Sequence, residues 1–218
     1  GSASGIFSDI KLSKEIKNQR KYYLENLYDL LDLIVKLKVD NDFRFPINEN
    51  VKQSLKQIFK QNKNYVGIAP GAGEKNKVWP IQNYIEICRY LEAKDCILIF
   101  YLGPNEKEYE EILKSNFKRA IFLENELLLS KYSNIEIIMT STKFLKFAIS
   151  NDSGVSHMLS TNLCPLIKLF GPKDAKKFTP RIKNLITISS SEVNSDRVED
   201  IKVSRVIKTI EDMKFINV

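Results

Sequence analysis

The chain has 218 residues, of which 43% are hydrophobic and 28% charged, and its net charge is +7. This composition excludes a disordered chain, and the length fits one domain with an appendage. No apolar run approaches the roughly 18 residues of a membrane span, and the first residues lack the basic and then apolar layout of a signal peptide.

The basic charge is compatible with nucleic acid, an anionic membrane or a phosphorylated small molecule as a partner. Only 7 of the 34 basic residues are Arg, and the lysines are spread along the chain. Nucleic-acid-binding proteins usually concentrate Arg and interleave aromatic residues. We therefore expect no nucleic-acid partner.

Three cysteines, Cys88, Cys96 and Cys164, are scattered within apolar segments. An odd number in such places favours buried thiols over a disulfide framework or a zinc site. Buried thiols are typical of a reducing compartment, so we expect a soluble, cytoplasmic protein.

The first 64 residues are predicted to be helical. The apolar spacing predicts a helix over 19–39, and Asn48 is expected to cap a second helix that runs to Gln61. Two amphipathic helices cannot bury their own apolar faces, so they must pack on the following domain or on something outside this chain. We assign residues 1–64 to a helical linker or the remnant of an N-terminal half, and 65–218 to a Rossmann-like domain.

From Tyr65 onward, short apolar runs alternate with helical patterns. The strands are predicted at 65–70, 96–101, 120–123, 147–150, 166–170 and 185–188, and the helices at 81–91, 106–113, 135–143, 156–161 and 203–213. This alternation predicts an α/β fold with a doubly wound parallel sheet and helices on both faces. Ligands of such sheets bind beyond the carboxyl ends of the strands.

The loop after the first strand, 70–80, has the composition of a phosphate site. Its two glycines, Gly71 and Gly73, let backbone N–H groups approach a ligand, and a helix with an anion-attracting N-terminus follows. Lys75 and Lys77 add cationic donors. The loop is neither a P-loop nor the dinucleotide fingerprint, and an ordinary glycine-rich turn remains the alternative. Trp79, in the same loop, is expected to be a packing anchor.

Two further strand-to-helix loops carry polar residues. Glu106 could accept hydrogen bonds from ribose hydroxyls, or be only a favourable charge in the first turn of a helix. In the third loop, Ser153 and Gly154 would present a hydroxyl and N–H groups at a helix N-terminus, with Asp152 at the strand tip. Asp152 or Ser153 could instead simply cap the helix. His157, the sole histidine, would face either the crevice or the core.

Taken together, these residues resemble glycosyltransferase family 9, the heptosyltransferases of lipopolysaccharide core assembly. The matching elements are Gly71-Ala72-Gly73, Lys77-x-Trp79-Pro80, Gly103 with Glu106, Asn151-Asp152-Ser153-Gly154-x-x-His157, and Phe170-Gly171-Pro172 with Pro180. The resemblance covers residues 65 to about 218 and implies the C-terminal, donor-binding half of a two-domain GT-B enzyme.

The resemblance also implies roles for these residues. The segment Gly71, Ala72 and Gly73 would hold the donor diphosphate together with Lys77, and Ser153 and Gly154 would make the second phosphate contact. Glu106 would bind the ribose hydroxyls, Asp152 the hydroxyls of the transferred sugar, and His157 belongs to the same binding signature. Lys77 and Asp152 would be the catalytic residues of this half. Many members carry hydroxyl residues where this chain has Ala72 and Gly73, so backbone N–H groups would have to replace those contacts.

The implied reaction is an inverting transfer from a nucleoside-diphosphate sugar, with ADP-heptose expected as the donor and a lipopolysaccharide-type glycolipid or saccharide as the acceptor. No metal and no cofactor are expected. Lys77 and the helix N-termini would stabilise the leaving diphosphate. The general base and the acceptor site belong to the family's N-terminal domain. Peripheral contact with the anionic inner membrane is a further expectation.

The sequence departs from the family before Tyr65. A complete member has another α/β domain there, whereas this chain has about 64 residues without a strand pattern. We interpret the chain as a fragment, or as a naturally split or degenerate protein, that binds a donor better than it transfers one. A non-catalytic nucleotide-sugar-binding module remains an alternative. So does another nucleotide-binding doubly wound domain, although Asp152 followed by Ser-Gly does not fit a phosphoacceptor aspartate.

Overall fold

The computed structural model describes residues 45–179 and 184–214, so the helix predicted over 19–39 lies outside the described residues. The chain divides into two compact units. One comprises Arg44–Pro172 with Ile182–Val218 and holds the sheet. In the other, the described part is one short helix, α8 (Ala175–Phe178), whose turn is held by Phe178 N donating to Asp174 O at 3.2 Å.

The described part of the sheet-bearing unit contains six parallel strands. They are β1 (Asn64–Ala69), β2 (Cys96–Phe100), β3 (Ile121–Phe122), β4 (Leu145–Asn151), β5 (Leu166–Phe170) and β6 (Leu185–Ser189). Their order is β3-β2-β1-β4-β5-β6, and every neighbouring pair is parallel. The predicted doubly wound α/β fold is thereby confirmed. The chain reverses its direction of strand addition between β1 and β4, so a ligand crevice is expected beyond the carboxyl ends of these two strands.

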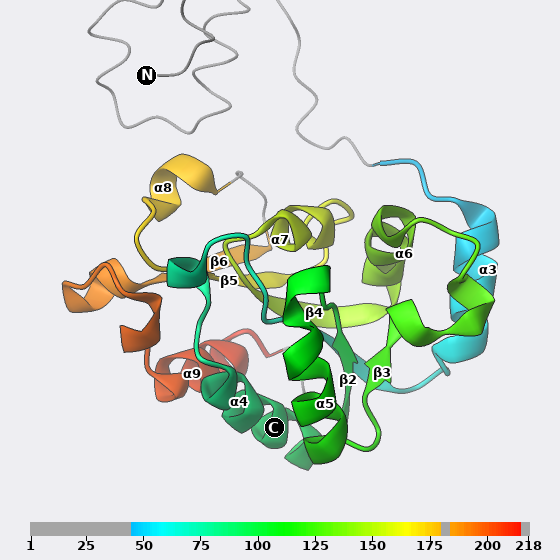
Figure 1. Cartoon of the computed structure of the whole chain (residues 1–218), viewed down its shortest axis with the longest axis horizontal. Coiled ribbons are helices and arrows are strands. Elements are labelled where there is room, and N and C mark those ends of the chain that lie inside the picture. The colour runs from blue at the N-terminus through cyan, green and yellow to red at the C-terminus, as the bar shows by residue number, and fades with distance from the viewer. Residues whose placement is uncertain (1–44, 180–183, 215–218) are drawn as a thin grey trace, which may run out of the picture. The chain divides into compact units, whose positions relative to one another are not determined.

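Helices cover both faces of this sheet (Figure 1). Their bounds are α3 (Glu49–Ile58), α4 (Ile81–Ala93), α5 (Lys107–Asn116), α6 (Asn134–Ser141), α7 (Gly154–Leu159) and α9 (Val203–Asp212). The strands alternate between the two layers. In β1, Val66 and Ile68 belong to the core beneath α4, α5 and α9, and Tyr65 and Ala69 to the core beneath α3, α6 and α7.

Helix α3 begins where its sequence predicts. The side chain of Asn48 accepts hydrogen bonds from Asn50 N at 3.0 Å and Val51 N at 3.4 Å. Val51 and Leu55 are fully buried in the core that α3 shares with α6. The sheet-bearing unit therefore begins at Arg44, ahead of the predicted boundary at residue 64.

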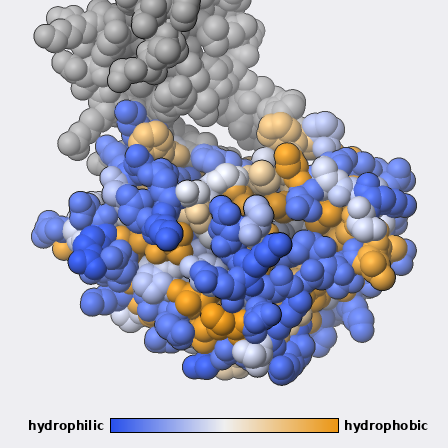
Figure 2. Space-filling view, in the orientation of Figure 1, coloured by the Kyte–Doolittle hydropathy of each residue, from blue (hydrophilic) through white to orange (hydrophobic). Residues whose placement is uncertain are grey.

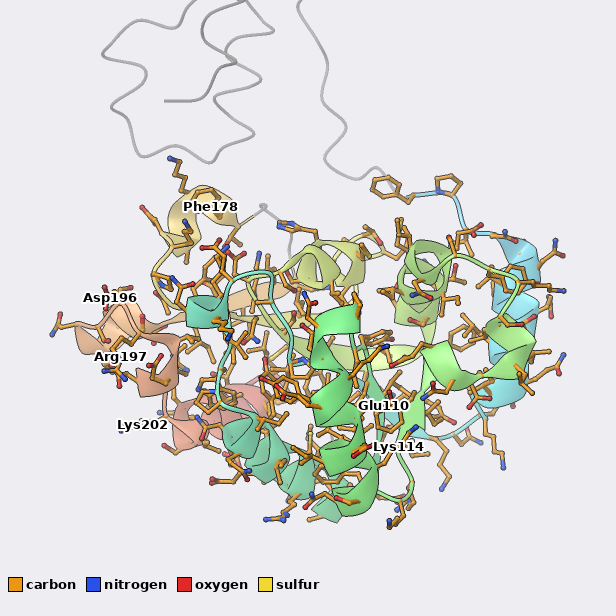
Figure 3. The ribbon with its side chains drawn as sticks, viewed as in Figure 1. Glu110, Lys114, Phe178, Asp196, Arg197 and Lys202 are labelled. Carbon is orange, nitrogen blue, oxygen red and sulfur yellow. The ribbon has the colours of Figure 1, made fainter. Side chains whose placement is uncertain are left out.

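Helix α5 is fastened to the loop that follows β3. Glu110 and Lys114, one turn apart on α5, form an ion pair (Figure 3). Glu110 also accepts a hydrogen bond from Asn125 Nδ2 at 2.7 Å, and the Lys114 ammonium lies 5.3 Å from the centre of the Phe122 ring. These contacts hold α5, and with it the β2–α5 loop, against the edge of the sheet.

The three cysteines are buried and free, as predicted. Burial raises the pKa of the Cys96 thiol to about 11 and that of the Cys164 thiol to about 12, so both stay protonated at neutral pH. On the face seen in Figure 2, hydrophilic residues cover most of the described surface. None of the described helices is both long and apolar enough to cross a membrane.

Candidate functional site

The glycine-rich loop after β1 leads into a short 3₁₀ turn at Lys75–Lys77, and α4 begins only at Ile81, after Pro80. The sequence predicted a helix N-terminus next to the glycines, but the turn takes that position. None of the glycines in the described ranges has a positive φ. The glycines of this loop therefore do not provide a left-handed turn. Instead, they let other groups approach the backbone closely or leave the neighbouring space open.

Asn151, the last residue of β4, ties this loop to the sheet. Its Nδ2 donates to Pro70 O at 2.6 Å, and its Oδ1 accepts from Trp79 N at 3.2 Å and from Tyr84 Oη at 3.0 Å. Asn151 is fully buried. One side chain thus closes both ends of the loop and positions the start of α4 against the third loop.

Trp79 is a packing anchor, as predicted. Its side chain is fully buried, its Nε1 donates to Ile201 O at 3.0 Å, and its ring packs edge-on against Tyr84 at 5.2 Å. No face of the indole remains for stacking with a base.

The first and second loops meet at Gly71 and Glu106. Glu106 Oε2 accepts a hydrogen bond from Gly103 N at 2.6 Å, so this carboxylate closes the turn that precedes α5. A Cβ on Gly71 would lie 2.4 Å from Glu106 Cδ. Only a glycine at position 71 lets the carboxylate sit against the phosphate loop. Glu106 therefore stabilises the turn before α5 and lies against the glycine-rich loop.

The third loop brings Ser153 to the N-terminus of α7. Ser153 Oγ accepts a hydrogen bond from Ser156 N at 3.3 Å, which is the capping role that the sequence offered as the alternative. A Cβ on Gly73 or on Gly154 would have no neighbour within 4 Å. At both predicted phosphate contacts, the space that a side chain would occupy is therefore open.

Lys77 connects the first loop with the third. Its Nζ lies 2.7 Å from Glu74 Oε1 and 3.7 Å from Asp152 Oδ2, and 16% of its side chain is exposed. The hydrogen bond to Glu74 is the main reason that the pKa of Lys77 is raised, and Asp152 adds to it. Lys77 is therefore a cation at neutral pH, and a carboxylate already occupies the position that the sequence assigns to a phosphate.

A second lysine approaches Asp152 from the sheet. Lys168, in the middle of β5, is 1% exposed, and its Nζ lies 2.7 Å from Asp152 Oδ1 and 4.8 Å from the centre of the Phe170 ring. Nζ makes no hydrogen bond of acceptable geometry with the described chain, so the ion pair is its main stabilising contact. Burial lowers the pKa of Lys168, and the Asp152 carboxylate counteracts that effect.

His157 lies on α7, one turn beyond Ser153, and is an exposed residue. Partial desolvation of its ring and the nearby Lys168 charge lower the pKa of His157, whereas Asp152 raises it. His157 is therefore neutral at pH 7, and it reports on the charges of this cluster.

Two residues of this site, Lys168 and Glu74, were not predicted from the sequence, and neither was the structural role of Asn151. A signal for Lys168 was present, because it is the one charged residue in the otherwise apolar strand Leu166–Phe170. A lysine on a strand covered on both faces needs a counter-charge. Glu74 carries no such signal, since glutamates in exposed loops are common.

No group of three or more His, Cys, Asp or Glu that could hold a metal ion occurs within 45–179 and 184–214. The chemistry available here is that of two lysines, the two carboxylates paired with them, the Glu106 carboxylate and open backbone. Such a set can bind a doubly charged anion next to a hydroxyl-bearing group.

The parallel sheet with helices on both faces is the fold of a GT-B glycosyltransferase domain. The model of glycosyltransferase family 9 (heptosyltransferase) matches residues 6–205, so the chain belongs to this family. The match includes residues well before Tyr65, where the resemblance of the sequence motifs began.

Similar proteins include lipopolysaccharide heptosyltransferase 1 of Campylobacter coli, 29% identical over 196 residues, which are 88% of this chain and 55% of that protein. Lipooligosaccharide heptosyltransferase 2 of Campylobacter jejuni is 26% identical over 161 residues, or 73% of this chain and 48% of that protein. The chain thus spans about half the length of these relatives.

Two solved structures share the fold. The glycosyltransferase family 9 structure from Veillonella parvula has a TM-score of 0.75 at 16% identity and covers 89% of this chain and 61% of its own. The Escherichia coli heptosyltransferase WaaC with ADP has a TM-score of 0.65 at 16% identity and covers 96% of this chain and 61% of its own.

Proposed function

We propose that this chain is the donor-binding half of a heptosyltransferase. Its donor is a nucleoside-diphosphate sugar, with ADP-heptose as the first candidate, and the sugar is transferred with inversion to a lipopolysaccharide-type acceptor. The observation that carries the proposal is the meeting of Lys77 and Asp152 at the switch point of the sheet, between backbone at Gly73 and Gly154 that faces open space. The relatives named as heptosyltransferases, and the heptosyltransferase WaaC of the same fold that was solved with ADP, support the choice of donor.

In this proposal the diphosphate binds Lys77 and the backbone at Ala72 and Gly73. The ammonium neutralises charge that grows on the leaving diphosphate as the anomeric bond breaks. Asp152 accepts hydrogen bonds from sugar hydroxyls, and Glu106 accepts them from the ribose. The base that deprotonates the acceptor hydroxyl, the acceptor itself and any contact with the cytoplasmic face of the inner membrane belong to the part of the enzyme that this chain does not cover.

Calorimetry with ADP, GDP and UDP tests whether the chain binds a nucleoside diphosphate. We expect weak binding of at least one of them, with ADP the tightest. The absence of heat with all three at millimolar concentration would rule the proposal out.

Replacing Lys77 should weaken binding without unfolding the chain. The side chain lies in a short turn and fills no core, so Lys77→Ala removes only its charge-assisted hydrogen bonds. A bond of this kind contributes about 1.5–3 kcal/mol, which corresponds to a loss of ADP affinity of roughly ten- to a hundredfold. Lys75→Ala, in the same turn, is the matched control and should change the affinity little. Equal losses for both variants would mean that general electrostatics, not a specific contact, binds the phosphates.

Removing the competing carboxylate should have the opposite effect. The donor's phosphate must displace Glu74 from Lys77, and this half-exposed ion pair contributes up to about 1 kcal/mol. Glu74→Gln should therefore raise ADP affinity, by up to about fivefold at low salt, and the gain should shrink as salt increases. Glu111→Gln, an exposed carboxylate on α5, is the control. A loss of affinity in Glu74→Gln would contradict the displacement.

Donor binding is expected not to need a divalent cation. Magnesium usually binds nucleotides through one or two protein carboxylates, and here Asp152 and Glu74 already neutralise lysines. ADP affinity should be the same in EDTA and in millimolar Mg²⁺. A strict requirement for Mg²⁺ would show that a metal, rather than Lys77, carries the phosphate charge.

A further inference from the structure

The two oxygens of the Asp152 carboxylate are divided between two lysines. Oδ1 lies 2.7 Å from the Nζ of Lys168, and Oδ2 lies 3.7 Å from the Nζ of Lys77. The two lysines differ in burial, since 16% of the Lys77 side chain is exposed but only 1% of the Lys168 side chain. Solvent and ligands can therefore reach Lys77, whereas Lys168 lies behind the carboxylate, inside the sheet.

We propose that Lys168 is a positioning residue of the sugar subsite: its buried ammonium holds Oδ1 of Asp152, so that Oδ2 stays directed into the crevice and is free to accept sugar hydroxyls once Lys77 turns to the diphosphate. This inference rests on the proposed function. It assigns a role to a residue that no motif of the chain contains.

The backbone supports this fixed geometry. Asp152 N donates to Leu169 O at 3.1 Å, and Ser150 pairs with Lys168 in the register between β4 and β5. The lysine and the aspartate thus stand on neighbouring strands with a fixed offset. The Phe170 ring, 4.8 Å from Nζ, limits where the ammonium can move.

Charge explains why a lysine in this position matters for the donor. Lys77 and Lys168 balance Glu74 and Asp152 in the free protein. When a diphosphate binds Lys77, Asp152 lies next to the phosphates and loses Lys77 as its cationic partner. Lys168 is then the cation that still holds the Asp152 carboxylate. Without Lys168, the carboxylate would be repelled by the diphosphate and would lose its defined direction.

The experiment compares Lys168→Met with wild type in three measurements: affinity for ADP, affinity for ADP-heptose, and a crystal structure of the ligand-free chain. Met keeps the length of the side chain and removes the charge. We expect ADP affinity to change by less than about threefold and ADP-heptose affinity to fall about tenfold or more, because only the sugar contact depends on Asp152. In the crystal structure, the carboxylate should have left its wild-type position. Lys146→Met, an exposed lysine on β4, is the control and should change none of these.

His157 supplies a readout without any ligand. As the sole histidine, it can be titrated by NMR without assignment ambiguity. The groups that act on its charge are Lys168 and Asp152. If Lys168 is charged in the folded protein, Lys168→Met raises the pKa of His157. An unchanged pKa in a variant whose Asp152 carboxylate keeps its wild-type position would mean that Lys168 is neutral and cannot hold a carboxylate, which overturns the inference.

The outcomes separate this inference from the proposed function. If wild type binds neither ADP nor ADP-heptose, the proposed function fails, and the crystal structure and the His157 titration still decide whether Lys168 positions Asp152. If wild type binds both ligands and Lys168→Met weakens them equally, or leaves the carboxylate in place, Lys168 is only a structural residue.

Discussion

Asp152→Asn is expected to destabilise the chain strongly, and not only to weaken a sugar contact. The change removes the counter-charge of Lys168, which is 1% exposed and has no hydrogen bond of acceptable geometry within the described residues. Breaking a buried ion pair from one side costs about 3–5 kcal/mol, because the remaining charge stays buried. Thermal unfolding should show a melting temperature lower by on the order of 10 °C.

A second substitution should reverse this loss. In the double variant Asp152→Asn with Lys168→Met, neither charge is buried, and replacing both partners of such a pair is often neutral or stabilising. Most of the lost stability should return, while binding of ADP-heptose should not. Asp196→Asn, an exposed aspartate in the loop before α9 (Figure 3), is the control and should leave the melting temperature unchanged. If the double variant is no more stable than Asp152→Asn, the unpaired lysine is not the cause.

This result would change how the role of Asp152 must be measured. From the sequence alone, Asp152→Asn would be expected to leave the stability of the chain unchanged, because Asn caps a helix nearly as well as Asp. The cap of α7 is Ser153, however, and Asp152 is one partner of a buried ion pair. A lower ADP-heptose affinity in Asp152→Asn alone would therefore mix lost hydroxyl contacts with a loosened loop. The double variant separates the two effects.

The strands and the order of the loops could be predicted because their signals are local. An apolar run such as Cys96–Phe100 is typical of a strand covered on both faces, and its bounds agree with the prediction to within one residue. The alternation of strands and helices then implies a parallel sheet and puts the three loops at one edge. This reasoning put the loops of Lys77 and Asp152 at the same edge, and the structure places the Nζ of Lys77 3.7 Å from Oδ2 of Asp152.

The remaining parts of the site depend on contacts between distant segments, which a pattern in one segment cannot reveal. Lys168 meets Asp152 across two strands, and Gly71 meets Glu106 across two loops. The sequence predicted that Gly71 lets backbone N–H groups approach a ligand, whereas in the structure its φ is not positive and the neighbouring Glu106 carboxylate is what excludes a side chain. Such residues require the register of the sheet, which the sequence does not provide.

Asn151→Ala should be the other severe substitution, and it should affect stability and nucleotide binding together. Alanine leaves the N–H of Trp79, the hydroxyl of Tyr84 and the carbonyl of Pro70 without their partner inside the protein. Each buried polar group left unsatisfied costs about 1–3 kcal/mol, so we expect a loss of at least about 3 kcal/mol in the free energy of unfolding.

The binding measurement on Asn151→Ala distinguishes a structural asparagine from one that organises the site. The side chain holds both ends of the loop that carries Gly73 and Lys77, so its removal should lower ADP affinity even at temperatures where the variant is fully folded. Asn162→Ala is the matched control: this asparagine is also buried, but its amide donates to Met139 O, at 3.0 Å, away from the loop. It should lose some stability and keep the affinity of wild type. If Asn151→Ala, when folded, binds ADP as wild type does, the loop holds its shape without this residue, and the phosphate site is preorganised by the 3₁₀ turn at Lys75–Lys77 instead.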